Sequence, residues 1–280
     1  MKEHGEAVPV CGVEFSATQY SRRPSNSAFR DFRPLSKKKS TLTSESMPQA
    51  PPARLTPIAS LSSTLAVIAV ASLNAYRGAV NAQLAFSGVV LSRPRLYLRT
   101  MLFEWLILAI AIAGVRLRGG SLQAILGPRW RSFLQAGRDG GLGIALLAGS
   151  ILLTSILNGI LLGAGSNQAI KFLLPQTGFE LLLWMGVSIS AGVCEEAVYR
   201  GYLQRQFAAY THSVPAGILI SAIAFGAVHL YQGLARASVI AVSAILFGLV
   251  AHWRGSVRPG MFAHSIQDAI APFIIHLTGR

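Results

Sequence analysis

The chain has 280 residues, of which 52% are hydrophobic and only 13% are charged. Soluble domains usually carry about 25% charged residues, so this composition excludes an ordinary soluble protein. The net charge of +14 comes from basic residues that lie in an N-terminal segment and between apolar runs, where the topology determinants of membrane proteins belong. No basic helix or aromatic-basic module is present, so the charge does not indicate nucleic-acid binding.

Apolar runs recur through the last 220 residues and predict an all-α fold, a polytopic transmembrane helical bundle of about seven spans. Three parts are expected. Residues 1–56 form a disordered, basic, cytoplasmic tail, because they are rich in Ser, Pro, Arg and Lys and hold too little apolar surface for a core. Residues 57–140 hold N-terminal transmembrane helices and an interfacial segment, and residues 141–280 form the membrane domain with the candidate site.

The spans are expected at about 57–75, 101–115 and 141–162, then from about 178, and at about 214–230, 237–253 and 259–277. The short apolar stretch 84–91 and the amphipathic segment 121–137 are predicted to lie at the membrane interface. A loop is expected over residues 165–177. The distribution of Lys and Arg between the two sides favours a cytoplasmic N-terminus.

Two adjacent glutamates, Glu195 and Glu196, close an apolar run in a chain that is poor in acids. A charged side chain at membrane depth costs about 2.5–3.5 kcal/mol, so two adjacent carboxylates there indicate a functional or structural role. Arg200 lies four residues after Glu196, and the two can form an ion pair on a helix. Glu195 then points about 100° away around the helix, toward a cavity.

Two other predicted spans supply further ionisable groups: His229 on one, and His264 with Asp268 on the other. Phe225, one turn before His229, is expected to wall the site. Each group also has an ordinary interpretation, namely a structural bridge, an interhelical hydrogen bond, or a pair that holds two helices together. Their coincidence on separate spans favours a site. Glu104, alone in the second span, is interpreted as snorkelling or paired rather than catalytic.

These groups form three ordered motifs: Glu-Glu-x-x-x-Arg over residues 195–200, Phe-x-x-x-His over 225–229 and His-x-x-x-Asp over 264–268. In this order the motifs resemble the CAAX protease and bacteriocin-processing family (CPBP, or Abi) of intramembrane proteases. The resemblance covers about residues 142–277 and implies that residues 141–280 are the catalytic domain. It implies an endopeptidase that cuts a membrane-anchored protein or peptide. Eukaryotic relatives remove the last three residues of prenylated proteins.

Eukaryotic relatives usually have asparagine at the position of Asp268. This bacterial-type variant predicts a multi-pass protein of a bacterial inner (plasma) membrane. The expected partners are the lipid bilayer and the membrane-anchored substrate, with no nucleic acid.

The residues suggest a mechanism in which Glu195 is the general base. His229 and His264 would bind and polarise the water or steady the oxyanion, Asp268 would orient His264, and Arg200 would hold Glu196. No Ser-His-Asp or Cys-His arrangement fits the spans, which argues against a nucleophilic enzyme.

A metal version stays open. Glu195, His229 and His264 are a set of ligands that a divalent metal such as zinc accepts, although the His-Glu-x-x-His motif is absent. The metal-free mechanism is preferred. A transporter or proton-relay protein is the alternative function, because intramembrane Glu, His and Asp also mark ion paths. A non-catalytic scaffold is a third reading.

Overall fold

The computed structural model describes residues 55–161 and 172–278, and the described residues form helices and no strand. Residues 1–54 of the expected tail and 165–171 of the expected loop lie outside the described residues. In chain order the elements are α1 (Leu61–Phe86), α2 (Arg93–Leu117), α3 (Gln123–Leu126), α4 (Phe133–Leu161), α6 (Gly178–Glu195), the π-helix η1 (Glu196–Leu203), α7 (Gln204–Thr211), α8 (Val214–Ala227), the 3₁₀ turn η2 (Leu230–Gln232), α9 (Leu234–Arg254) and α10 (Arg258–Thr278).

Within the described ranges, five helices are long and apolar enough to cross a membrane: α1, α2, α4, the continuous segment of α6, η1 and α7, and α9. This supports a multi-pass membrane protein, but the expected count of seven spans is not confirmed. α8 has only 14 residues, about 21 Å at 1.5 Å per residue, against a hydrocarbon core of about 30 Å. α10 is long enough, but its polar residues leave it outside the group.

The helix boundaries differ from the expected ones where polar residues continue an apolar helix. α1 continues to Phe86 and takes in the start of the stretch 84–91 that was expected at the interface. The segment 121–137 divides into α3 and the first turn of α4, which begins at Phe133 rather than near residue 141. The spans expected near 237–253 and 259–277 correspond to α9 and α10.

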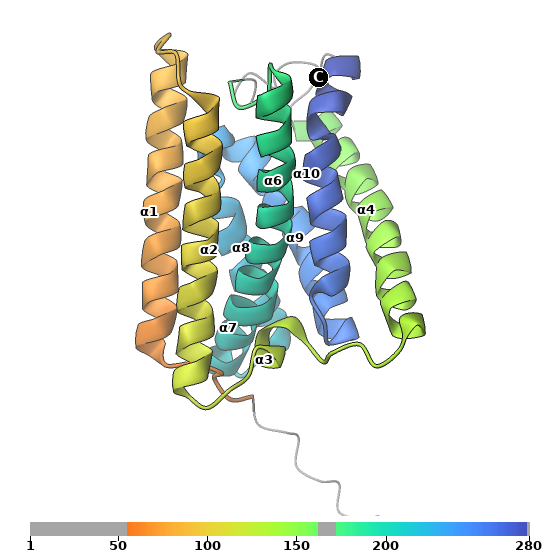
Figure 1. Ribbon diagram of the computed structural model, residues 1–280. Helices are drawn as coiled ribbons and strands as arrows, with labels where there is room; N and C mark the ends of the chain where they lie inside the picture. The colour runs from red at the N-terminus through yellow and green to blue at the C-terminus, as the bar shows by residue number, and fades with distance from the viewer. Residues whose placement is uncertain (1–54, 162–171, 279–280) are drawn as a thin grey trace, which may run out of the picture. The chain divides into compact units, whose positions relative to one another are not determined.

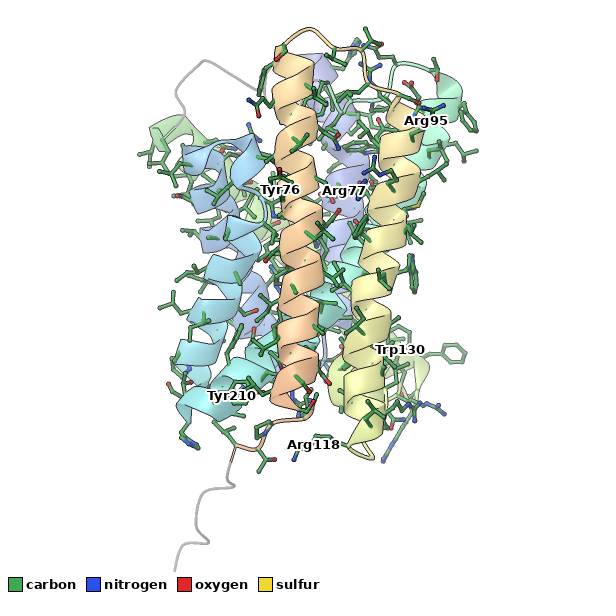
Figure 2. The ribbon with its side chains drawn as sticks, turned by 90° about the vertical axis from the view of Figure 1, so that its left-hand side faces the viewer. Tyr76, Arg77, Arg95, Arg118, Trp130 and Tyr210 are labelled. Carbon is green, nitrogen blue, oxygen red and sulfur yellow. The ribbon has the colours of Figure 1, made fainter. Side chains whose placement is uncertain are left out.

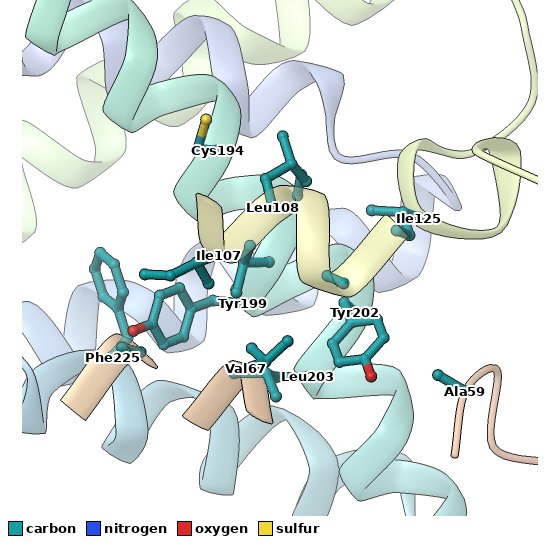
Figure 3. Close-up of a cluster of buried hydrophobic side chains, with 14 of the residues drawn as sticks. Ala59, Val67, Ile107, Leu108, Ile125, Cys194, Tyr199, Tyr202, Leu203 and Phe225 are labelled. Atoms are coloured by element: carbon teal, nitrogen blue, oxygen red, sulfur yellow. The ribbon is translucent and has the colours of Figure 1, made fainter. Parts of the chain in front are cut away.

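The central helix of the bundle is α6, which packs against α2 on one side and α10 on the other (Figure 1). α10 also packs against α4, and α8 lies between α7 and α9. The largest core cluster joins α1, α2, η1 and α8 (Figure 3). Val67, Ile107, Tyr202 and Phe225 are buried in it. The core therefore surrounds the segment in which α6 passes into η1.

The start of α6 is set by a capping arrangement that the sequence encodes. Thr177 is the N-cap and its hydroxyl accepts from the Glu180 backbone N–H at 3.1 Å, while the Glu180 carboxylate accepts from the Gln176 N–H at 2.7 Å. Reciprocal bonds of this kind satisfy orphan donors of the first helical turn. The helix that starts there is 18 residues long and ends at Glu195.

Candidate active site

The two adjacent glutamates lie at a change of helix type. Glu195 is the last residue of α6, and Glu196 is the first residue of the π-helix η1. All eight residues of η1 are buried. Short π segments inside α-helices are rare and are frequent at functional sites, because the wider turn redirects side chains. A regular α-helix was expected through residues 195–200, but from Glu196 onward the structure has a π-helix, whose turns are wider.

Glu196 is fully buried and is neutralised by an arginine. Its Oε1 lies 3.0 Å from Nη1 of Arg200, which confirms the expected ion pair. The Arg200 guanidinium also lies over two aromatic rings, at 4.3 Å from the centroid of Phe225 and 5.4 Å from that of Phe247. A desolvated guanidinium over an aromatic face gains cation–π attraction, so the pair is held on the apolar side as well.

His264 of α10 reaches both glutamates. Its Nδ1 donates to Glu196 Oε1 at 3.1 Å, since a carboxylate can only accept. Its Nε2 lies 3.7 Å from Glu195 Oε2 and 3.5 Å from Asp268 Oδ2. The expected His264–Asp268 pair is present, but the shortest bond to the imidazole comes from Glu196. Glu196 therefore links Arg200 to His264, a contact that helix spacing did not predict.

A glycine allows α10 to approach α6 so closely. A Cβ on Gly192 would lie 2.7 Å from the backbone N of Ser265 and 2.9 Å from the carbonyl oxygen of Met261. Gly260 likewise leaves room for the Glu196 side chain, because a Cβ at Gly260 would lie 2.7 Å from Glu196 Oε2. Neither position has room for a side chain.

His229 lies just after α8 rather than inside a helix, because α8 ends at Ala227. The span expected over 214–230 is wrong at this end. The Nδ1 of His229 lies 2.8 Å from the carbonyl oxygen of Phe225. A carbonyl only accepts, so Nδ1 carries the hydrogen and Nε2 keeps a lone pair. The rings of Phe225 and His229 are 4.8 Å apart, which confirms Phe225 as a wall of the site.

All six predicted site residues line one cavity of about 460 Å³: Glu195, Glu196, Arg200, His229, His264 and Asp268. The Glu195 side chain is 21% exposed and that of Asp268 is 38% exposed, whereas Glu196 is closed off. The cavity thus presents two accessible carboxylates, Glu195 and Asp268, beside two imidazoles, in a setting otherwise lined largely by apolar side chains. Such a cavity has room for a peptide bond and a water beside the carboxylates.

Glu104 of α2 lines the same cavity, which the motifs did not predict. Its side chain is buried, and its Oε2 accepts from the Ser190 hydroxyl of α6 at 2.5 Å. Among the described residues, no Arg, Lys or His lies within ion-pair distance of it. The buried side chain does not snorkel to the interface but pairs with Ser190, and its expected lack of a catalytic role stays a prediction. Its only signal was a lone acid in an apolar span.

The metal alternative concerns Glu195, His229 and His264. Among the described residues, no group of three or more His, Cys, Asp or Glu side chains is arranged to hold a metal ion. His229 and His264 line the cavity with Glu195.

The comparisons with known proteins identify part of the chain. Residues 176–270 match the family model of the Rce1-like type II CAAX prenyl endopeptidases. The matched segment holds all six predicted site residues and confirms the resemblance that the three motifs indicate. No curated protein and no solved structure matches the chain. Glu104 lies outside the matched segment.

Proposed function

We propose that this protein is an intramembrane endopeptidase that hydrolyses a peptide bond by means of a water activated by Glu195. The observation that carries the proposal is the convergence of three motifs from separate elements on one cavity. There, Nε2 of His264 lies 3.7 Å from the accessible Glu195 carboxylate and 3.5 Å from Asp268. The family match supports the same reaction class.

Glu195 takes a proton from the water as the oxygen bonds to the scissile carbonyl carbon. The carbon–nitrogen bond then breaks, and the proton passes to the leaving amine, so the balance is simple hydrolysis. The lone pair on His229 Nε2 suits it to accept a hydrogen from the water. Three carboxylates surround His264, so we take the imidazole as the imidazolium, whose Nε2–H would donate to the substrate oxygen. The separations of Nε2 from Glu195 and Asp268 exceed a usual hydrogen bond, so an oxygen placed beside these groups, rather than between them, would contact both.

Glu196 and Arg200 act through His264. Glu196 accepts from His264 Nδ1 and thereby directs Nε2 toward Glu195 and Asp268. Arg200 offsets the charge of the buried Glu196 at 3.0 Å. Both are positioning residues, since neither needs to touch the substrate.

The substrate class that fits is a membrane-associated protein or peptide, of the prenylated type that the matched family's description names. A cavity lined mainly by apolar side chains and reached from helices of a membrane bundle accepts a segment that itself partitions into lipid.

The test is cleavage by the purified, reconstituted protein. Wild type and Glu195→Gln are incubated with a pool of membrane-anchored peptides, with and without a chelator, and new termini are identified by mass spectrometry. Glu180→Gln is the matched control, because Glu180 caps the same helix and lies outside the cavity.

Cleavage by wild type and by Glu180→Gln that is lost in Glu195→Gln and survives chelation supports the proposal. Loss on chelation that zinc restores would replace it with the metal version. Equal cleavage by wild type and Glu195→Gln would remove Glu195 as the base. No cleavage of any peptide by the wild type would favour the transporter or scaffold alternatives.

A further inference from the structure

A second, smaller cavity lies at the helix ends remote from the catalytic residues. Its volume is about 200 Å³. It lies where the loop before α4, the first two turns of α4 and the junction of α9 with α10 meet. The residues that line it are Pro128, Arg129, Trp130, Arg131, Gln135, Asp139, Arg254, Ser256 and Arg258. Four arginines against one aspartate give this lining a net charge of +3.

The walls of this cavity are held by a buried acid. Asp139 is 2% exposed; its Oδ1 accepts from Arg254 Nε at 2.7 Å and its Oδ2 from Trp130 Nε1 at 2.7 Å. Because Arg254 uses Nε for this bond, its two Nη groups stay available, and they bond to no described residue. The Asp139 carboxylate thus fixes the side chains of Arg254 and Trp130, so this part of the cavity wall is preorganised.

The opposite wall is also fixed. The Arg258 guanidinium lies over the Trp130 ring, 5.2 Å from its centroid, and donates to the carbonyl of Pro128 at 2.6 Å. By contrast, the guanidinium groups of Arg129 and Arg131 are exposed and bond to no residue in the described ranges. Arg254 and Arg258 therefore form the walls of the cavity, while Arg129 and Arg131 are available to bind a ligand.

The position of the cavity indicates its ligand. α4 begins at Phe133 and α9 ends at Arg254, and both helices are apolar enough to cross a membrane. Because it lies at the ends of these helices, we expect the cavity at the level where headgroups meet the hydrocarbon. Trp130 is half exposed and Phe133 is 98% exposed beside it. Aromatic side chains of this kind gather at membrane interfaces. Figure 2 shows Trp130 toward the end of the bundle that carries Arg118, away from Arg95.

We infer that this cavity binds the phosphodiester headgroup of an anionic phospholipid. Arginine donors match phosphate oxygens in geometry as well as charge, and basic pockets between transmembrane helices bind such headgroups. The positive end of α10 starts at Arg258, beside Ser256, and adds to the attraction. A zwitterionic headgroup brings its own cation into a lining of charge +3 and binds less well. The inference does not depend on the peptidase activity.

The experiment compares two double variants of the full-length protein in nonionic detergent micelles. Arg129→Gln/Arg131→Gln removes the two free arginines. Arg116→Gln/Arg138→Gln removes the same charge from exposed positions at the same end of the bundle but outside the cavity. Each protein is titrated with phosphatidylglycerol, with phosphatidylcholine of the same chains, and with inorganic phosphate. The readouts are the thermal unfolding midpoint and the lipid retained per protein after gel filtration.

We expect saturable binding of phosphatidylglycerol to the wild type, weakened roughly thirtyfold in Arg129→Gln/Arg131→Gln and less than about threefold in the control. Equal weakening in the two double variants would overturn the site in favour of diffuse charge. Equal binding of phosphatidylcholine would overturn the anionic specificity. Binding of inorganic phosphate as tight as that of the lipid would assign the cavity to a free anion instead.

Discussion

At the residue scale, the buried Glu196 depends on two partners, Arg200 at 3.0 Å and His264 at 3.1 Å. Removing one member of a buried ion pair leaves an uncompensated charge, which costs about 3–5 kcal/mol. The sequence identified the Glu196–Arg200 pair from its spacing of four. It did not identify the bond to His264, because that bond depends on how α10 is placed against α6.

A double-mutant cycle measures how strongly the pair is coupled. We expect Glu196→Gln and Arg200→Met each to lower the free energy of unfolding by about 3 kcal/mol, and the double variant to lose clearly less than the sum of the two. Chemical denaturation in micelles measures each value. Additive losses would show that the two side chains do not stabilise each other.

Glu104, unlike Glu196, is expected to lower the stability of the fold while it contributes to activity. It is a buried carboxylate whose hydrogen-bond partner, Ser190, is neutral, and burying a charge without a cation is costly. Glu104→Gln keeps the shape and an acceptor for Ser190 but removes the charge. We expect an unfolding midpoint that is equal or higher, together with a kcat/KM that is roughly tenfold lower, about 1.4 kcal/mol of transition-state stabilisation.

Thermal unfolding and cleavage assays measured on the same preparations check this expectation, with Glu180→Gln as the control. A kcat/KM of Glu104→Gln equal to that of wild type would show that Glu104 does not contribute to catalysis. A large fall in the unfolding midpoint would instead give Glu104 a structural role.

At the element scale, the site exists because α6 and α10 touch at Gly192. A Cβ there would meet the backbone of Ser265 and Met261, so Gly192→Ala must push the helices apart. We expect it to cost about 1–3 kcal/mol of stability and to lower cleavage by moving His264 away from Glu195.

Gly186→Ala on the same helix is the matched control. The nearest atom to a Cβ at Gly186 is the Met101 sulfur, at an ordinary contact distance of 3.5 Å. Alanine is also favoured over glycine within a helix by about 1 kcal/mol. We expect this variant to be at least as stable as wild type. Equal behaviour of the two variants would show that the close approach at Gly192 has no consequence.

The sequence predicted the all-α membrane class and the six residues that meet in the cavity, because apolar runs and short motifs are local signals. It misjudged α8, since hydropathy continues through Val228 while the backbone turns at Ala227. The π-helix η1 leaves no mark in the apolar pattern. Glu104 was missed because it lies 91 residues before Glu195 in the chain and only packing of α2 on α6 brings it close.

At the scale of the whole molecule, basic residues are concentrated at one end of the helices. That end carries Arg116, Arg118, Arg129, Arg131, Arg138, Arg254 and Arg258. The positive-inside rule predicts that it faces the cytoplasm. We expect Ser121→Cys, at this end, to be protected from a membrane-impermeant maleimide in intact cells, and Ser87→Cys, after α1, to be labelled. Both variants are made with Cys11 and Cys194 replaced by serine. The reverse labelling pattern would invert the orientation.

The most direct test of the central claim is the kcat/KM of Glu195→Gln for a peptide that the wild type cleaves, compared with that of Glu180→Gln. General-base catalysis typically contributes 10²–10⁴-fold. We predict at least about a hundredfold loss for Glu195→Gln and no more than about a twofold change for Glu180→Gln, with both variants folded. A Glu195→Gln enzyme that retains wild-type kcat/KM would contradict the assignment of Glu195 as the group that activates water.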